Sequence, residues 1–121
     1  MATKAKVIKI LRSYSDVEDQ GDDVFQVTVP LSDNGRSQLL FMDVRDDLLI
    51  MLSPFAHRDD ISPAKAIDMA EIFGVATNGD YYVLSNVLHI ENIKESEIIS
   101  AMTYLAIQAD ILEEEVGGDD L

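Results

Sequence analysis

The sequence predicts an α+β domain in which an antiparallel sheet packs against three helices. Some stretches alternate apolar and polar residues between turn residues, which is typical of strands, while three others space apolar residues three or four apart, which is typical of helices. The predicted order is α-β-β-β-α-β-β-α, and short turns make successive strands antiparallel. With 121 residues the chain has the size of one domain. We place that domain at residues 1–116 and a flexible acidic tail at residues 117–121.

The two central strands form a hairpin that is apolar on both faces. The stretch at residues 39–52 is broken by charges where we predict the turn, at Arg45-Asp46, with Val44 opposite Asp47. One face then carries Leu40, Met42, Leu49 and Met51, and the other carries Leu39, Phe41, Ile50 and Leu52. An antiparallel hairpin usually shows one polar face to water, so the second face here needs a cover. Either the chain's own helices or another protein supplies it.

Elements before the hairpin follow from periodicity and turn residues. Residues 3–14 predict an amphipathic helix, and the acidic residues 16–23, which include Gly21, end it. Residues 24–31 alternate as a strand that Pro30 ends or places at an edge. The following Ser32-Asp33-Asn34-Gly35 predicts a turn, because Asn and Gly accept positive φ. It resembles the start of a calcium loop but lacks the later ligands.

Elements after the hairpin begin with a helix at Ser62-Pro63, which we expect to run to Phe73 with Ile67 and Ala70 inward and Gly74 as its cap. A second hairpin turns at Asn78-Gly79, between strands at residues 75–77 and 81–88. A capping box of Asn92 and Glu95 begins the last helix, which extends to about Val116. Its inward residues are Ile98, Met102, Leu105, Ala109 and Leu112.

Composition argues against several partners. The net charge is −14, from 23 acidic and 9 basic residues, which disfavours nucleic acids and anionic membranes and favours a basic protein partner. The chain has no cysteine, no apolar run long enough to cross a bilayer and no apolar export signal. These features predict a cytoplasmic protein, although acidity also serves solubility alone.

Catalytic and metal motifs are missing from the sequence. His57 and His89 lie at predicted strand ends without a third ligand pattern, and no Gly-x-Ser-x-Gly elbow occurs. Paired carboxylates fall in turns or in the tail, where they are well solvated and therefore poor candidates for acid–base catalysis. We therefore predict no enzyme, no cofactor and no metal site.

The element order, size, acidity and apolar sheet together resemble the type III secretion chaperone-like fold, in particular the YbjN-type, Tir chaperone-like domains. The resemblance extends from the first helix through the strands at residues 24–31 and 39–52 and the helix after Ser62-Pro63 to the last helix. It implies a non-enzymatic domain, often a homodimer, that binds extended or amphipathic segments of other proteins. By position, the middle helix and its neighbouring strand would form the dimer, and the first helix and the sheet would hold the client.

We accordingly predict a homodimeric, chaperone-like, protein-binding module whose partner is of unknown identity. The predicted partner contacts are Val7, Leu11, Leu40, Met42, Leu49 and Met51. The predicted dimer contacts are Ala66, Ala70, Phe73, Tyr81 and Val83. The alternative is a regulatory or structural protein whose apolar sheet is wholly internal and whose acidic surface docks a basic partner.

Overall fold

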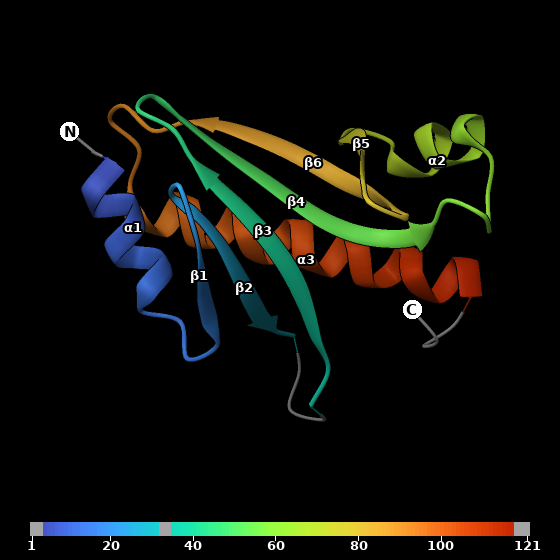
Figure 1. Ribbon diagram of the computed structural model, residues 1–121, viewed down its shortest axis with the longest axis horizontal. Helices are drawn as coiled ribbons and strands as arrows, with labels where there is room; N and C mark the ends of the chain where they lie inside the picture. The colour runs from blue at the N-terminus through green and yellow to red at the C-terminus, as the bar shows by residue number, and fades with distance from the viewer. Residues whose placement is uncertain (1–3, 32–34, 118–121) are drawn as a thin grey trace.

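The structure is a computed structural model that describes residues 4–31 and 35–117. Within them, three helices accompany six strands (Figure 1). In chain order the elements are α1 (Lys4–Arg12), β1 (Val17–Gly21), β2 (Val24–Pro30), β3 (Ser37–Val44), β4 (Leu48–His57), α2 (Pro63–Ala70), β5 (Gly74–Asn78), β6 (Tyr81–His89) and α3 (Glu95–Gly117). The α+β class is confirmed, with one strand more than predicted. Most of the predicted turn at residues 32–35 and of the predicted tail lies outside the described residues.

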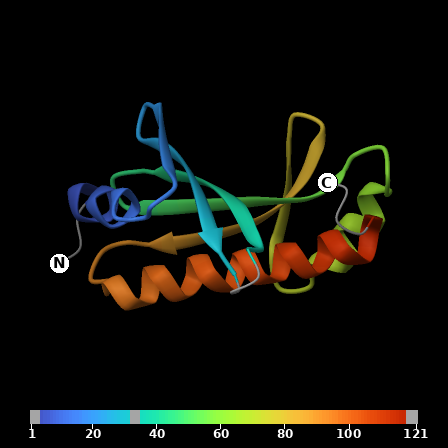
Figure 2. The same cartoon turned by 90° about the horizontal axis from the view of Figure 1, so that it is seen from below.

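The six strands form one antiparallel sheet in the order β1-β2-β3-β4-β6-β5. The long helix α3 runs along one face of this sheet, which we call the inner face (Figure 2). The β1–β2 and β5–β6 turns project from the opposite, outer face, so the middle of that face lies between two raised hairpins (Figure 2).

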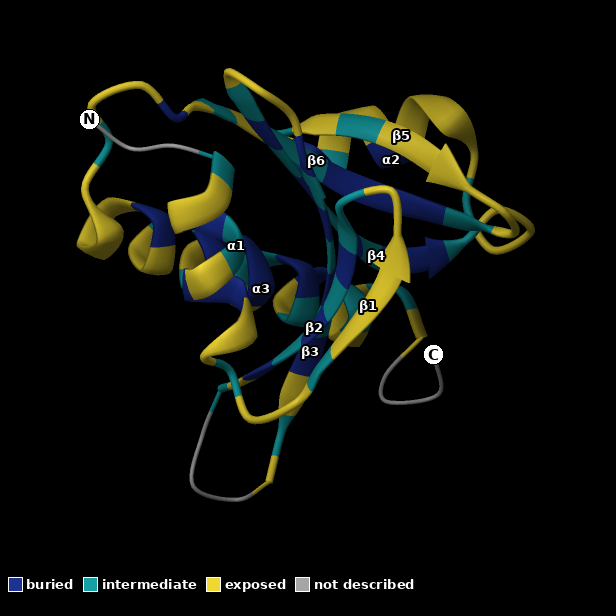
Figure 3. Ribbon diagram, turned by 60° about the vertical axis from the view of Figure 1, so that its left-hand side comes forward, coloured by how far each residue is buried: buried dark blue, intermediate teal, exposed yellow. Residues whose placement is uncertain are grey.

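The additional strand is β1, where we had predicted only an acidic break. It pairs with β2 at the edge of the sheet, and all of its residues after Val17 are exposed (Figure 3). The turn into β2 is tight, because Asp22 and Asp23 both take positive φ, at 54° and 62°. A polar edge strand of this kind shows little hydrophobic alternation, so the prediction was wrong there. Charge on an edge also discourages pairing with other chains.

The inner faces of the central strands form the core together with α3. The predicted division of the hairpin into two faces is confirmed, although Val44 pairs with Leu49 instead of Asp47. The register is offset by two residues, and side chains repeat every two residues along a strand, so the faces are unchanged. Leu40, Met42, Leu49 and Met51 are fully buried. The predicted inward residues of α3 are also buried, as expected for the helix that covers the sheet.

The second helix begins as predicted and buries Ala70 as predicted, but it does not bury Ile67. The hydroxyl of Ser62 accepts a hydrogen bond from the backbone N–H of Lys65 at 3.1 Å. Its buried residues are Ala66 and Ala70, whereas Ile67 is 66% exposed, so the inward placement of Ile67 was wrong. The helix ends at Ala70.

Two predicted helix caps are also displaced. Glu71, with φ 54° and ψ −105°, is the residue of positive φ at the end of the helix, and Gly74, which we had predicted as a left-handed cap, instead begins β5. At the start of α3 the cap lies two residues later than predicted, since the backbone N–H of Lys94 donates to Oε1 of Glu97 at 3.2 Å. In both cases the type of element was right and its boundary was not.

Candidate functional site

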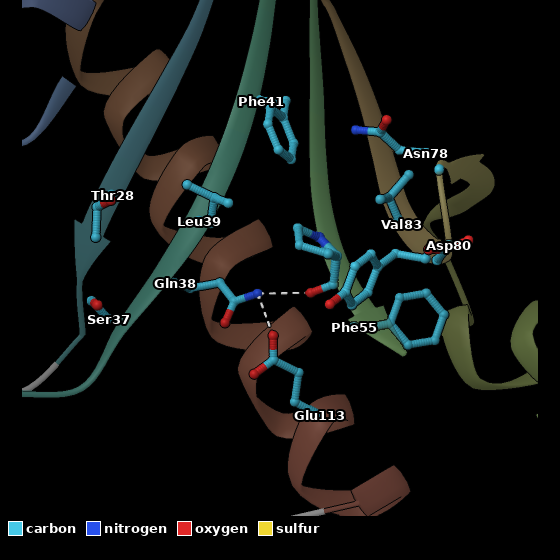
Figure 4. Close-up of a pocket in the computed structure, with 13 residues that line it drawn as sticks. Thr28, Ser37, Gln38, Leu39, Phe41, Phe55, Asn78, Asp80, Val83 and Glu113 are labelled. Carbon is cyan, nitrogen blue, oxygen red and sulfur yellow. Dashed lines mark hydrogen bonds between the residues drawn. The ribbon is translucent and has the colours of Figure 1, made fainter. Parts of the chain in front are cut away.

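The candidate site is an opening in the middle of the sheet, between β3 and β4. The two strands pair only from Val44 with Leu49 to Phe41 with Leu52. Beyond that point, residues 37–40 pair with β2 alone and residues 53–57 pair with β6 alone. The strands therefore diverge above α3 (Figures 1 and 4). We call the space between residues 37–40 and residues 53–57 the slot.

Proline at position 54 accounts for the divergence. If the register continued, Pro54 would lie opposite Leu39, but proline has no backbone N–H to donate to the carbonyl of Leu39. The β4 strand also changes register against β6 between Pro54 and Ala56, and such a bulge bends a strand. The β3–β4 ladder therefore stops beside Pro54, while β4 continues to His57 on β6.

Two side chains bridge β3 and β4 where the backbone hydrogen bonds between these strands are missing. The hydroxyl of Ser53 donates to the carbonyl oxygen of Leu39 at 2.8 Å, and Nε2 of Gln38 donates to the carbonyl oxygen of Pro54 at 2.8 Å. Both side chains are buried, with Gln38 4% exposed and Ser53 fully buried. Side-chain amides and hydroxyls thus satisfy carbonyls that backbone N–H groups satisfy elsewhere in the sheet.

The floor of the slot is tied to α3 by polar contacts. Nε2 of Gln38 lies 2.8 Å from Oε1 of Glu113, and Figure 4 shows Glu113 rising from α3 toward Gln38. Arg36, just before β3, forms an ion pair of 2.6 Å with Asp110 and one of 2.9 Å with Glu114. The Asp110 side chain is only 16% exposed, so this pair is better shielded from water than a fully exposed one. These contacts hold α3 beneath the divergent strands.

A cavity of about 640 Å³ opens at the slot. It is lined by Thr28, Ser37, Gln38, Leu39, Phe41, Pro54, Phe55, Asn78, Gly79, Asp80, Tyr81, Val83 and Glu113. Most of these groups are apolar or uncharged, two are acidic, and no lysine or arginine occurs among the described lining residues. Apolar walls with a few polar groups are typical of binding sites.

The cavity is continuous with an apolar outer face. Leu39, Phe41, Ile50 and Leu52 on that face are partly exposed, and Val87 on neighbouring β6 is 48% exposed. Asp43 lies on the same face and pairs with Arg45 at 2.8 Å. The described helices contact the sheet from the inner face or at its ends, so the middle of the outer face has no helical cover (Figure 2).

The structure changes the set of residues that can meet a partner. The six predicted contacts, Val7, Leu11, Leu40, Met42, Leu49 and Met51, are all fully buried. Their side chains belong to the core, and the hairpin side chains that reach the outer face are the alternate residues Leu39, Phe41, Ile50 and Leu52. The pattern of alternation along the chain defines two faces but does not say which one α3 covers.

The predicted dimer contacts include both buried and partly exposed residues. Ala66, Ala70 and Val83 are at most 3% exposed and pack within their own chain, whereas Phe73 and Tyr81 reach the surface. Sequence reasoning missed Ile67 and Ile72, which are 66% and 79% exposed and are the most exposed large apolar side chains among the described residues. The rotation of α2 that exposes Ile67 depends on which small residues pack best, and the spacing alone does not determine it.

The two histidines do not come together. His57 pairs with Tyr81 at one end of the β4–β6 ladder, where the two ring centroids are 4.3 Å apart, and His89 pairs with Leu48 at the other end. Within residues 4–31 and 35–117, no three His, Asp or Glu side chains are grouped to hold a metal ion.

Two electrostatic perturbations involve α1 and β1. The pKa of Lys4 is raised chiefly by its hydrogen bond to Asp23, at 2.6 Å. The pKa of Asp19 is lowered chiefly by the backbone N–H of Gly21 and further by Arg12. These contacts fasten α1 to the β1–β2 hairpin.

Comparisons with protein-family models, with curated proteins and with solved structures found no match. None of the described helices combines the length and the apolar character needed to cross a bilayer.

Proposed function

We propose that this protein is a non-enzymatic, chaperone-like binding module that holds an extended or amphipathic segment of a partner protein on the outer face of its sheet. The observation that carries the proposal is the partly exposed apolar face of β3, β4 and β6, which no described helix covers. Contiguous apolar surface on a soluble domain commonly marks an interaction site.

Covering this face would release a useful free energy. Full burial of a large apolar side chain contributes about 1.5–3 kcal/mol, and the outer residues Leu39, Phe41 and Leu52 are partly exposed. Each therefore has only a fraction of that amount left to gain from a partner. Several such contributions together suit a reversible complex.

Charge indicates the kind of segment. The chain carries −14, and the cavity has Asp80 and Glu113 in its lining. An acidic surface speeds encounter with basic segments and repels acidic ones. We therefore expect the partner segment to combine apolar residues with lysine or arginine.

A second copy of the chain would occupy a different place, the end formed by α2 and β5. Ile67, Ile72, Phe73 and Tyr81 are at the surface there. The edge strand β5 carries no charged residue, whereas the opposite edge strand β1 carries Glu18 and Asp19. Uncharged edges are open to pairing and charged edges resist it, so β5 is the edge suited to a homodimer.

Binding to the outer face can be tested by capture of partners from an extract of the native cell. We expect Val87→Asp, which puts a charge on the outer face, to lose partners that the wild type captures. The matched control is Ile107→Asp on the exposed side of α3, where the side chain is 39% exposed. Both variants must give the wild-type circular dichroism spectrum. Identical partner lists for the wild type and Val87→Asp would contradict the proposal.

The homodimer is tested separately by light scattering. We expect a mass near twice 13.4 kDa for the wild type and a shift toward 13.4 kDa for Ile72→Glu. Ile111→Glu, also at a surface isoleucine but on α3, should leave the mass unchanged. A wild-type mass of one chain at all concentrations would remove the dimer and leave the partner site untouched.

The alternative, docking of a basic partner by acidic surface alone, is favoured by one feature of α3. This helix has six acidic and no basic residues, and Tyr104, Ile107 and Ile111 are exposed along it. Salt distinguishes the two modes, because screening weakens a complex between exposed charges far more than an apolar one. A complex that is lost at high ionic strength and is unaffected by Val87→Asp would support the alternative.

A further inference from the structure

We infer that the partner segment, bound on the outer face, extends into the slot as an added strand between β3 and β4. This inference rests on the proposed function and specifies how the segment is held and what its sequence is like. The expected occupant is an extended segment in which apolar residues alternate with lysine or arginine.

The two edges of the slot are strand edges inside a sheet. Residues 37–40 and 53–57 each pair on one side only, although both stretches are in strand conformation. Strand edges are templates for backbone pairing, and proteins normally cover or charge them. Here the cover consists of the short side chains of Ser53 and Gln38, which satisfy one carbonyl each. An added strand could satisfy both edges together.

The geometry sets the direction of entry. Neighbouring strands lie about 4.8 Å apart, so two strands that flank an added one lie about 9.6 Å apart. The slot is closed at the pairing of Phe41 with Leu52 and widens away from it (Figure 4). A segment therefore enters at the wide end, beside Ser37 and His57, and displaces the Gln38 side chain. Since β3 and β4 are antiparallel, the added strand runs parallel to one of them and antiparallel to the other.

The walls of the slot define the side chains of the segment. Successive residues of a strand point to opposite faces. On the outer face they would meet Leu39, Phe41 and Val83, and on the inner face they would meet Phe55 and the carboxylate of Glu113. Apolar residues suit the first set, and a cation suits the second. The two acidic residues of the lining, Asp80 and Glu113, favour a cation on the segment.

A second copy of the chain fits the slot poorly. Its described edge strands are β1, which carries Glu18 and Asp19, and β5, which has no basic residue. Charge complementarity therefore favours a basic partner segment over a strand from another copy.

The test is amide hydrogen exchange, followed by NMR, with synthetic peptides as probes. The first peptide alternates valine and arginine over about eight residues, long enough to fill one strand. The second has the same sequence with alternate backbone nitrogens methylated, which removes donors. The third alternates valine and glutamate. We expect the first peptide alone to bind and to slow exchange at amides within residues 37–40 and 53–57.

A matched pair of variants tests the cation. Glu113→Gln keeps an acceptor for the Gln38 amide but removes the charge, and we expect it to weaken binding of the valine–arginine peptide about tenfold, the scale of one charge-assisted contact. Glu115→Gln removes an exposed charge from the same helix outside the cavity lining. We expect it to weaken binding less than twofold.

The possible results separate this inference from the proposed function. Protection confined to the slot by the first peptide supports strand insertion. Protection along β5 instead, equal binding of the methylated peptide, or no binding of the valine–arginine peptide overturns it. None of these results decides whether Val87→Asp loses its cellular partners, which is the test of the proposed function.

Discussion

The two ends of the β3–β4 pair are held together by different means. At the closed end, from Phe41 with Leu52 to Val44 with Leu49, the backbone ladder joins the strands. At the open end, Gln38 and Ser53 join them through side-chain hydrogen bonds. The core continues beneath both ends, with Met42 and Met51 at one and Phe55 at the other. The slot therefore arises from local backbone chemistry at Pro54 and not from a lack of core.

The largest loss of stability is expected from a core substitution at the closed end. Met51→Ala removes a fully buried side chain from the inner face and should lower the free energy of unfolding by about 2–5 kcal/mol. Leu52→Ala, at the next residue on the outer face, should cost about 1 kcal/mol, because Leu52 is partly exposed. Urea denaturation of the two variants measures both values. Equal losses would mean that the outer face is packed as tightly as the inner one.

A smaller effect is expected at the open end. Gln38→Met keeps the length of the side chain but leaves the Pro54 carbonyl and Glu113 without the amide donor. An unsatisfied buried acceptor costs about 1–3 kcal/mol, so the variant should be destabilised by that amount. Thermal or urea unfolding checks the value. A variant as stable as the wild type would show that Gln38 does not hold the open end together.

The smallest expected effect tests the role of proline directly. Pro54→Ala supplies a backbone N–H opposite Leu39 and gains a hydrogen bond of about 0.5–1.5 kcal/mol. It also gives up the rigidity of proline, which favours the folded chain by about 0.4–1 kcal/mol. The net change in stability should therefore be within about 1 kcal/mol of zero. The sharper readout is the new amide at position 54, whose exchange should be slow if the ladder extends. Rapid exchange would mean that another feature keeps the strands apart.

The sequence was sufficient to predict which residues share each apolar face of the β3–β4 hairpin. An offset of two residues in the predicted turn leaves every side chain on its face, because the period of a strand is two. The inward residues of α3 were predicted correctly because apolar residues three or four apart lie on one side of a helix. The prediction failed at β1 because only Val17 there is even partly buried. An edge strand with solvated side chains has no such pattern to detect.

The candidate site was harder to predict than the fold. Both faces of β3 and β4 are apolar in the sequence, and only the position of α3 shows that Met42 is buried while Phe41 is partly exposed. The slot did leave a signal, because Pro54 interrupts an apolar strand. Taken alone, that signal indicates the end of a strand. The strand continues because its other side pairs with β6, which is a long-range contact that no local pattern contains.

The most direct test of the account is photo-crosslinking in the native cell. A photoreactive phenylalanine derivative replaces Phe41 on the outer face in one experiment and Tyr104 on α3, which is 47% exposed, in another. If the outer face binds the partner, position 41 gives a discrete adduct with another protein and position 104 gives none. An adduct from position 104 alone would contradict this and favour docking on the acidic helix.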